Sequence, residues 1–393
     1  MCTVTTVNSR STSGDDDPLA AAGFLVRRDA HADCRVVDQV MPRAADGEVV
    51  VEVSSFGFSS NNITYAEMGD ALGYWRCFPA EEGWGNVPVW GFGRVAESGH
   101  EAIAPGTRVY GLVPPATHTV LRPSRCSPAG FVEASEHRRT LPGAYNWYEV
   151  AGSDPTFEAQ TEAEQMLLRP LFFTSFLLAD LIAEDESVPG RVIISSASSK
   201  TAHGTAYLLA AAGGNTVGLT SPSRAGFVRS LGVYDDVVTY DELDRLDEGA
   251  ATFLDFAGDP QIRAAVHQQV GAQLTRSLSI GMTHVGKLEI GGTAELPGAR
   301  PTFFFAPDRI KERTRDWGRD GLVQRFAAAW TDYVQWVDTW LQVTRTAGLD
   351  GLRAVYLDVL SGNVDPAHGH IIELHGPPSS DTERSESANG PPQ

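Results

Sequence analysis

Residues 191–220 read RVIISSASSKTAHGTAYLLAAAGGNTVGLT, which is two short apolar runs separated by a polar turn and a helical stretch. Arg191–Ile194 and Thr216–Thr220 have the composition of buried parallel strands, Thr201–Ala212 that of a helix, and Gly213-Gly214 ends that helix. The same alternation continues to residue 281, with predicted strands at 237–240, 252–256 and 277–281 and predicted helices at 224–231 and 260–270. Strands that alternate with helices of about ten residues predict an α/β fold with a doubly wound parallel sheet.

The segments on either side of this unit have a different character. Residues 24–150 contain many short, alternating strands with Gly and Pro between them, which predicts a small β-barrel. Glu162–Glu186 has a helical pattern that includes Pro170, and Gly318–Thr346 is predicted as a long, aromatic-rich amphipathic helix. The chain then ends its ordered part with a predicted strand at Gly369–Leu374.

These patterns divide the 393 residues into five segments. Both ends are rich in Ser, Thr, Asp and Pro and are predicted to be disordered tails. Between the tails we expect the barrel domain, the parallel-sheet domain and a return segment that packs on the barrel domain. The predicted boundaries are 1–17 for the first tail, 18–160, 161–300 and 301–376 for the three structured segments, and 377–393 for the second tail.

Charge and cysteine content exclude several classes of protein. The net charge of −19 disfavours binding to nucleic acids or to anionic membranes, because both need clustered Lys and Arg. The cysteines at positions 2, 34, 77 and 126 share no CxxC spacing, so neither a zinc ribbon nor a disulfide scaffold is expected. The N-terminus lacks the apolar core of a signal peptide, and no run of 18 apolar residues is present. We therefore expect a cytoplasmic protein.

The turn after the strand Arg191–Ile194 is a candidate phosphate site. A dinucleotide-binding fold places its phosphate loop between the first strand and the first helix, where helix amides attract anions. The usual GxGxxG glycines are absent, and the turn instead offers hydroxyls and one positive charge, from Ser196, Ser198, Ser199, Lys200 and Thr201. The structural alternative is a serine cap on an ordinary helix. The missing glycines also leave open a chain that kept the fold without binding a nucleotide.

The end of the second strand favours NADP over NAD. An NAD-selective site would place Asp or Glu near this point to bind the ribose hydroxyls. The sequence has Thr220, Ser221 and Arg224 instead, and a guanidinium suits a 2′-phosphate. Tyr240, after the next strand, is placed to flank the adenine. The structural alternative for Arg224 is an incidental cation at an exposed helix start.

The order of a barrel, a parallel-sheet unit and a return segment resembles the medium-chain dehydrogenase/reductase superfamily, in its zinc-free, quinone-oxidoreductase-like branch. The resemblance spans about residues 24–376 and is most specific from Gly214 to Arg224, at 227–232 and at 237–240. It implies a GroES-like barrel domain, a Rossmann domain and NADP held by Thr220, Ser221, Arg224 and Tyr240. Residues 60–66, 167–172 and 195–202 further resemble a bacterial and fungal subgroup with no assigned reaction.

The sequence departs from the zinc enzymes of this superfamily. Ser59 stands near the position of their catalytic zinc cysteine, and the structural-zinc cysteine quartet is missing. Gly99-His-Glu resembles a zinc-ligand motif, but it falls in a loop downstream of the place where the ligand belongs. Because a zinc site needs at least three protein ligands, we predict no metal.

The resemblance also indicates where reacting groups lie. The segment 59–65 aligns with the part of the family that enters the cleft beside the nicotinamide, so Asn61, Asn62 and Tyr65 are candidate hydrogen-bond donors. Tyr74 aligns loosely with a proton-donating tyrosine of the enoyl reductases in this superfamily. His284 follows the last strand, where the family holds the nicotinamide carboxamide. The alternatives are a turn or helix cap for the asparagines, core packing for the tyrosines and a structural histidine.

We therefore expect an NADPH-dependent oxidoreductase that reduces an enone, enoyl thioester, quinone or ketone by zinc-free hydride transfer. A second hypothesis is an isomerase, lyase or cyclase that uses acid–base chemistry in the same cleft. A third is a non-enzymatic binding or scaffold protein. The partner is expected to be a small, apolar or acyl-thioester substrate, and a homodimer is plausible from the family.

Overall fold

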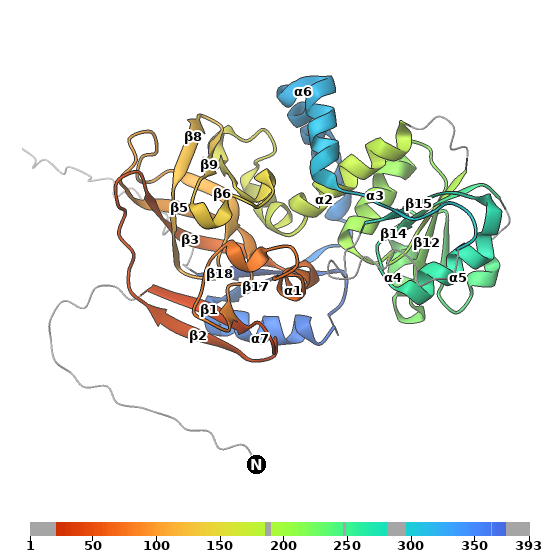
Figure 1. The fold of residues 1–393 in the computed structure, drawn as a ribbon, viewed down its shortest axis with the longest axis horizontal. Helices are drawn as coiled ribbons and strands as arrows, with labels where there is room; N and C mark the ends of the chain where they lie inside the picture. The colour runs from red at the N-terminus through yellow and green to blue at the C-terminus, as the bar shows by residue number, and fades with distance from the viewer. Residues whose placement is uncertain (1–20, 185–189, 247–248, 281–295, 363, 375–393) are drawn as a thin grey trace, which may run out of the picture.

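The computed structural model describes the chain from residue 21 to residue 374, apart from short gaps, and shows two domains with a long helix between them (Figure 1). One domain is a partly closed β-barrel and the other is a Rossmann domain built on a parallel sheet. Both predicted tails and His284 lie outside the described residues. The described residues are 21–184, 190–246, 249–280, 296–362 and 364–374.

The Rossmann sheet has its strands in the spatial order 3-2-1-4-5-6, counted from the first strand of this domain, and all the described pairings are parallel. Its strands in that spatial order are β13 (Asp236–Thr239), β12 (Thr216–Thr220), β11 (Arg191–Ile194), β14 (Ala251–Asp255), β15 (Leu274–Ser279) and β16 (Thr302–Phe303). The connecting helices are α3 (Lys200–Ala211), α4 (Ala225–Ser230) and α5 (Pro260–Val270). The strand order reverses between β11 and β14, so a ligand crevice is expected at the carboxyl ends of these strands.

The barrel domain is antiparallel apart from one pair of strands. Its larger sheet contains β3 (Val49–Phe58), β5 (Val89–Ser98), β6 (Arg108–Val113), β7 (His118–Leu121), β8 (Pro123–Ser127), β9 (Gly130–Glu133), β10 (Trp147–Val150), β17 (Gln342–Ala347) and β18 (His368–Glu373). Its smaller sheet contains β2 (Cys34–Gln39), β1 (Ala21–Arg27) and β4 (Trp84–Gly85). Helix α1 (Ser60–Glu67) follows β3, and the short 3-10 helix η1 (Tyr74–Arg76) follows α1.

The return segment adds two strands and a helix to the barrel domain. Strand β18 pairs antiparallel with β3 and parallel with β17, and helix α7 (Gly348–Leu360) packs its buried face into the barrel core. The prediction of a continuous helix to Thr346 is wrong, because α6 ends at Val337 and residues 342–347 form β17. Alternating β-branched residues in this stretch favour a strand, and the pairing with β18 satisfies their backbone groups.

Two long helices connect the domains. Helix α2 (Glu162–Ala183) packs on α3 and on α6 (Ala306–Val337), and α6 changes direction at Gly318. By length and composition alone, residues 159–183 could cross a membrane. However, Leu168, Phe172 and Leu177 are fully buried against neighbouring elements, as in the core helix of a folded domain.

Candidate functional site

Three segments that the sequence analysis singled out meet at the carboxyl edge of the Rossmann sheet. The turn from Ser195 to Ser199 leaves β11, residues 220–224 leave β12, and Tyr240 follows β13. The Tyr240 hydroxyl accepts a hydrogen bond from the backbone N–H of Ser196 at 2.8 Å, which ties the first and third of these segments together. The predicted cofactor residues are therefore neighbours in the fold, at the place where such a fold binds its ligand.

The start of helix α3 has the features of an anion site. Ser199 is the N-cap residue, and its Oγ accepts from the N–H of Ala202 at 3.3 Å, as the structural alternative requires. Within the described residues, the backbone N–H groups of Lys200 and Thr201 have no acceptor. Because free N–H groups at a helix start attract anions, the cap and a phosphate site are compatible here.

The two cations of the site are already engaged by the protein itself. The Lys200 ammonium donates to the carbonyl oxygens of Pro366 at 3.1 Å and His368 at 3.2 Å. The Arg224 guanidinium donates through Nη2 to the carbonyl oxygen of Val364 at 2.8 Å. All three acceptors belong to the return segment, which the sequence analysis did not connect with this site.

Burial makes the Lys200 charge costly. Desolvation lowers the pKa of Lys200 to about 8, although the nearby Asp365 carboxylate opposes this shift. Its described neighbours include no carboxylate in direct contact. A bound phosphate would provide the missing negative charge, so the phosphate end of a dinucleotide fits the residues present.

The residues at the end of β12 are placed differently from one another. Thr220 is buried, and its carbonyl accepts from the N–H of Tyr240 at 3.0 Å. Ser221 is half-buried, and its Oγ lies 3.1 Å from Oγ of Ser223. Ser198 is half-buried in the turn from Ser195 to Ser199, which we call the phosphate turn. Contact of the Ser198 and Ser221 hydroxyls with a cofactor stays a prediction.

Helix α1 carries the candidate donors of the barrel domain. The buried Asn62 accepts from the N–H of Ser59 at 2.9 Å and donates to the carbonyl of Pro88 at 3.0 Å. Its amide therefore holds the start of α1 in place, as the helix-cap alternative describes. Asn61 is half-buried one residue earlier, and its side chain lies beside the Tyr65 hydroxyl.

Tyr65 and Tyr74 belong to one aromatic cluster. Their rings lie 4.4 Å apart, Trp90 donates to the Tyr65 hydroxyl at 3.2 Å, and the Tyr74 and Tyr145 hydroxyls are 2.9 Å apart. Desolvation raises the pKa of Tyr65 and that of Tyr74, so both phenols stay protonated at neutral pH. The sequence gave no signal for these contacts, because Trp90 in β5 and Tyr145 in a 3-10 helix at 143–145 are distant from α1 along the chain.

The Gly99-His-Glu stretch, which resembles a zinc-ligand motif, lies in a loop after β5. The N–H of Ala102 donates to Nδ1 of His100 at 3.2 Å, and Nε2 of His100 lies 3.9 Å from Sγ of Cys126. Ser59 is the N-cap of α1. In the described part of the chain, no three His, Cys, Asp or Glu side chains are placed together to hold a metal ion.

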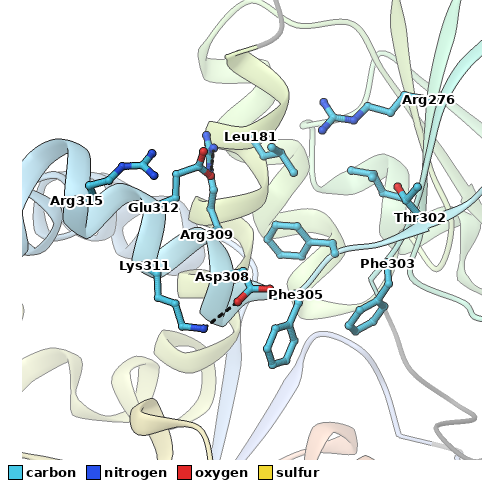
Figure 2. Close-up of a pocket in the computed structure, with 12 residues that line it drawn as sticks. Leu181, Arg276, Thr302, Phe303, Phe305, Asp308, Arg309, Lys311, Glu312 and Arg315 are labelled. Atoms are coloured by element: carbon cyan, nitrogen blue, oxygen red, sulfur yellow. Dashed lines mark hydrogen bonds and ion pairs between the residues drawn. The ribbon is translucent and has the colours of Figure 1, made fainter.

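A pocket of about 650 Å³ lies elsewhere, between β15, β16 and the start of α6 (Figure 2). Its wall combines aromatic residues such as Phe303 with charged residues such as Lys311. Lys311 pairs with Asp308 at 3.0 Å, and the buried Arg309 is paired with acidic neighbours. None of the predicted site residues that the structure describes lines this pocket, so we assign it no part in the site.

The sequence family described as "Protein of unknown function (DUF2855)" matches residues 56–365. The chain belongs to this family. The match covers α1, the whole Rossmann domain and the return segment as far as Asp365. No curated protein sequence matches the chain.

Solved structures place the DUF2855 chain in a known fold. CurA from Vibrio vulnificus, in complex with NADPH, is 12% identical with a TM-score of 0.60, and the alignment covers 91% of this chain and 100% of that one. A putative NADPH:quinone reductase from Bacillus thuringiensis is 14% identical, with a TM-score of 0.55 and the same coverage. The quinone oxidoreductase from Coxiella burnetii is 13% identical with a TM-score of 0.52, again covering 91% and 100%. The predicted fold class, a GroES-like barrel with a Rossmann domain, is confirmed.

Proposed function

We propose that this chain is an NADPH-dependent oxidoreductase that transfers a hydride to an enone, enoyl thioester, quinone or ketone without zinc. The observation that carries the proposal is the meeting of the α3 start, Arg224 and Tyr240 at one edge of the Rossmann sheet. The shared fold with CurA, which was crystallised with NADPH, supports it. A cytoplasmic location, a small apolar substrate and a homodimer belong to the same proposal.

The residues present fit the phosphate groups of the cofactor. The free N–H groups of Lys200 and Thr201, with the Lys200 ammonium, would hold the pyrophosphate. Arg224, with the hydroxyls of Thr220 and Ser221, would hold the 2′-phosphate, and Tyr240 would flank the adenine. When bound, NADPH supplies a hydride.

The barrel domain would supply the donors for the charge that develops on the substrate oxygen. Tyr65 is buried and protonated, and Trp90 donates a hydrogen bond to its hydroxyl. A fixed donor of this kind stabilises an oxyanion because it needs no reorganisation during the reaction. Tyr74, paired with Tyr145, is the second phenol from which a proton could move. Asn62 holds α1 in place through its two hydrogen bonds.

Fluorescence titration with NADPH and NADH tests this proposal. In Arg224→Met the NADPH dissociation constant should rise roughly 10- to 100-fold, because charge-assisted hydrogen bonds to the 2′-phosphate are lost. The NADH dissociation constant should change by less than about twofold. Arg229→Met is the matched control, since Arg229 lies in α4, the helix that Arg224 precedes as N-cap residue, and its guanidinium donates to the carbonyl of Val237 at 3.4 Å. Equal weakening of both cofactors in Arg224→Met would refute the 2′-phosphate role.

The second candidate function is an isomerase, lyase or cyclase on the same fold. It is favoured by the glycine-free phosphate turn and by the main-chain carbonyls that occupy Lys200 and Arg224. Absence of binding by the wild-type protein at millimolar NADPH and NADH would exclude the oxidoreductase and leave this alternative.

A further inference from the structure

Residues 364–368, which we call the crossover, join helix α7 to strand β18. Strand β18 pairs with β3, so the crossover belongs to the barrel domain. Lys200 and Arg224 belong to the Rossmann domain. The three hydrogen bonds from these cations to Val364, Pro366 and His368 therefore cross from one domain to the other.

The crossover is held in a defined shape. The N–H of Ala367 donates to Oδ1 of Asp365 at 2.9 Å, and the N–H of His368 donates to the carbonyl of Asp365 at 3.0 Å. Val364 is half-buried against the barrel core. This turn keeps the carbonyl groups of the crossover in fixed positions, so they act as a built acceptor site for the two cations.

Lys200 and Arg224 differ in the N–H groups that remain available to bind a phosphate. An ammonium has three protons, and Lys200 uses two of them on Pro366 and His368, so one can still bind a phosphate. A guanidinium binds phosphate in a bidentate manner through two N–H groups on one edge. The two edges that can do so are Nε with Nη2 and Nη1 with Nη2, so Nη2 belongs to both. In Arg224, Nη2 donates to Val364 at 2.8 Å and faces the carbonyl of Gly362 at 3.5 Å. Nη2 has one proton on each of these edges, and the two carbonyls engage both, so a two-pronged grip on a 2′-phosphate requires Arg224 to release at least one of them.

We propose that the crossover competes with the 2′-phosphate of NADPH for Arg224 and so reduces the preference of this protein for NADPH over NADH. This inference rests on the proposed function. The apparent affinity for NADPH is reduced by the fraction of molecules in which Arg224 is free. NADH has no 2′-phosphate and needs no release of Arg224, so the competition leaves its affinity unchanged.

Variants that loosen the crossover while leaving both cationic side chains in place test the competition. Asp365→Ala removes the acceptor that fixes the turn, and Pro366→Gly frees the backbone by a different route. Each should lower the NADPH dissociation constant roughly tenfold and change that of NADH by less than about twofold. Asp365→Asn keeps an oxygen acceptor while removing the charge, and Asp358→Asn removes a charge from the exposed face of α7. Neither control should change the ratio of the two dissociation constants.

Other outcomes overturn the proposal. If Asp365→Ala and Asp365→Asn lowered the NADPH dissociation constant equally, the effect would come from the lost charge and not from the loosened turn. If a variant lowered the NADPH and NADH dissociation constants in parallel, the crossover would not affect the preference for NADPH. If the wild type binds NADPH and its dissociation constant is unchanged in both Asp365→Ala and Pro366→Gly, the competition is refuted but the proposed function is not. Absence of NADPH binding in every variant would refute the proposed function and the competition together.

A measurement without cofactor separates these failures. Amide hydrogen exchange of a peptide that covers the crossover should be faster in Arg224→Met than in Arg229→Met, because of these two arginines Arg224 alone hydrogen-bonds to this segment. Faster exchange without any NADPH binding would mean that the interdomain link exists and the cofactor assignment is wrong. Unchanged exchange, with NADPH binding by the wild type, would mean that the crossover is not the competitor.

Discussion

Glu149 is a half-buried carboxyl that shares Arg169 with Asp154 where β10 faces α2. Arg169 lies 2.9 Å from Oε2 of Glu149 and 3.5 Å from Asp154. Desolvation, together with the Asp154 charge, raises the pKa of Glu149 to about 7 in spite of Arg169. The pKa of Asp154 is lowered, since Arg169 and the hydrogen bonds it accepts outweigh its burial. The Arg169 guanidinium therefore pairs with two carboxyl groups, of which Glu149 has the raised pKa and Asp154 the lowered pKa.

This shift makes stability depend on pH. The pKa of Glu149 is higher in the folded than in the unfolded protein, so the folded state binds more protons between about pH 4.5 and 7. The free energy of unfolding should therefore fall as pH rises through this range, and Glu149→Gln should remove that part of the slope. Thermal unfolding at several pH values measures it, with Glu158→Gln on an exposed turn as control. Parallel melting curves for Glu149→Gln and wild type would contradict the assignment.

The candidate cofactor residues could be found from sequence because each follows a strand closely. Ser196, Arg224 and Tyr240 lie within a few positions of the ends of β11, β12 and β13, and a parallel sheet brings those ends together. The bonds from Lys200 to the crossover could not be found in this way. They join residues 166 and 168 positions apart, and no local pattern marks a backbone carbonyl as an acceptor.

At the scale of elements, periodicity predicted strands β11 to β15 and helices α3 to α5 to within a few residues, but it did not predict β16, which lies beyond the expected end of the Rossmann domain at residue 300. Helix α5 occupies the predicted range Pro260–Val270, where a proline and an Asp259 cap mark the start. The predicted helix Gly318–Thr346 is wrong after Val337. Its aromatic pattern was continued into the residues of β17, and the pairing of β17 with β18 is not visible in the local sequence. Helix α7 was missed although its apolar residues recur at helical spacing, at Leu349, Leu352, Val355, Tyr356 and Val359.

Gly318 is where α6 changes direction, and it has φ 72° and ψ 167°. Side chains other than glycine rarely adopt this conformation, so Gly318→Ala should lower the free energy of unfolding by about 1–2 kcal/mol. No heavy atom lies within 4 Å of the added Cβ, so the cost would come from the backbone alone. Gly226→Ala in helix α4 is the control and should stabilise by about 0.4–1 kcal/mol. Urea unfolding measures both, and equal shifts would contradict the kink.

At the scale of the whole molecule, one aromatic cluster joins the two domains. It combines Phe92 and Tyr110 of the barrel with Phe172 of α2 and with Trp330 and Tyr333 of α6. The rings of Phe172 and Tyr333 are stacked with their centres 3.9 Å apart. Because this core is shared, neither domain can lose its structure without exposing apolar surface of the other. The crossover hydrogen bonds reinforce the same connection.

Shared burial predicts how the protein unfolds. Trp330 is 2% exposed, and Trp330→Ala should lower the free energy of unfolding by about 3–5 kcal/mol through the lost contacts and the cavity left behind. The cavity lies between the domains, so the variant should also uncouple them, and the van't Hoff enthalpy should fall below the calorimetric enthalpy. Differential scanning calorimetry measures both effects. Phe305→Ala, at an aromatic residue that is 45% exposed, should leave the ratio of enthalpies at its wild-type value. A single cooperative transition in Trp330→Ala would mean that other contacts, the crossover among them, are enough to couple the domains.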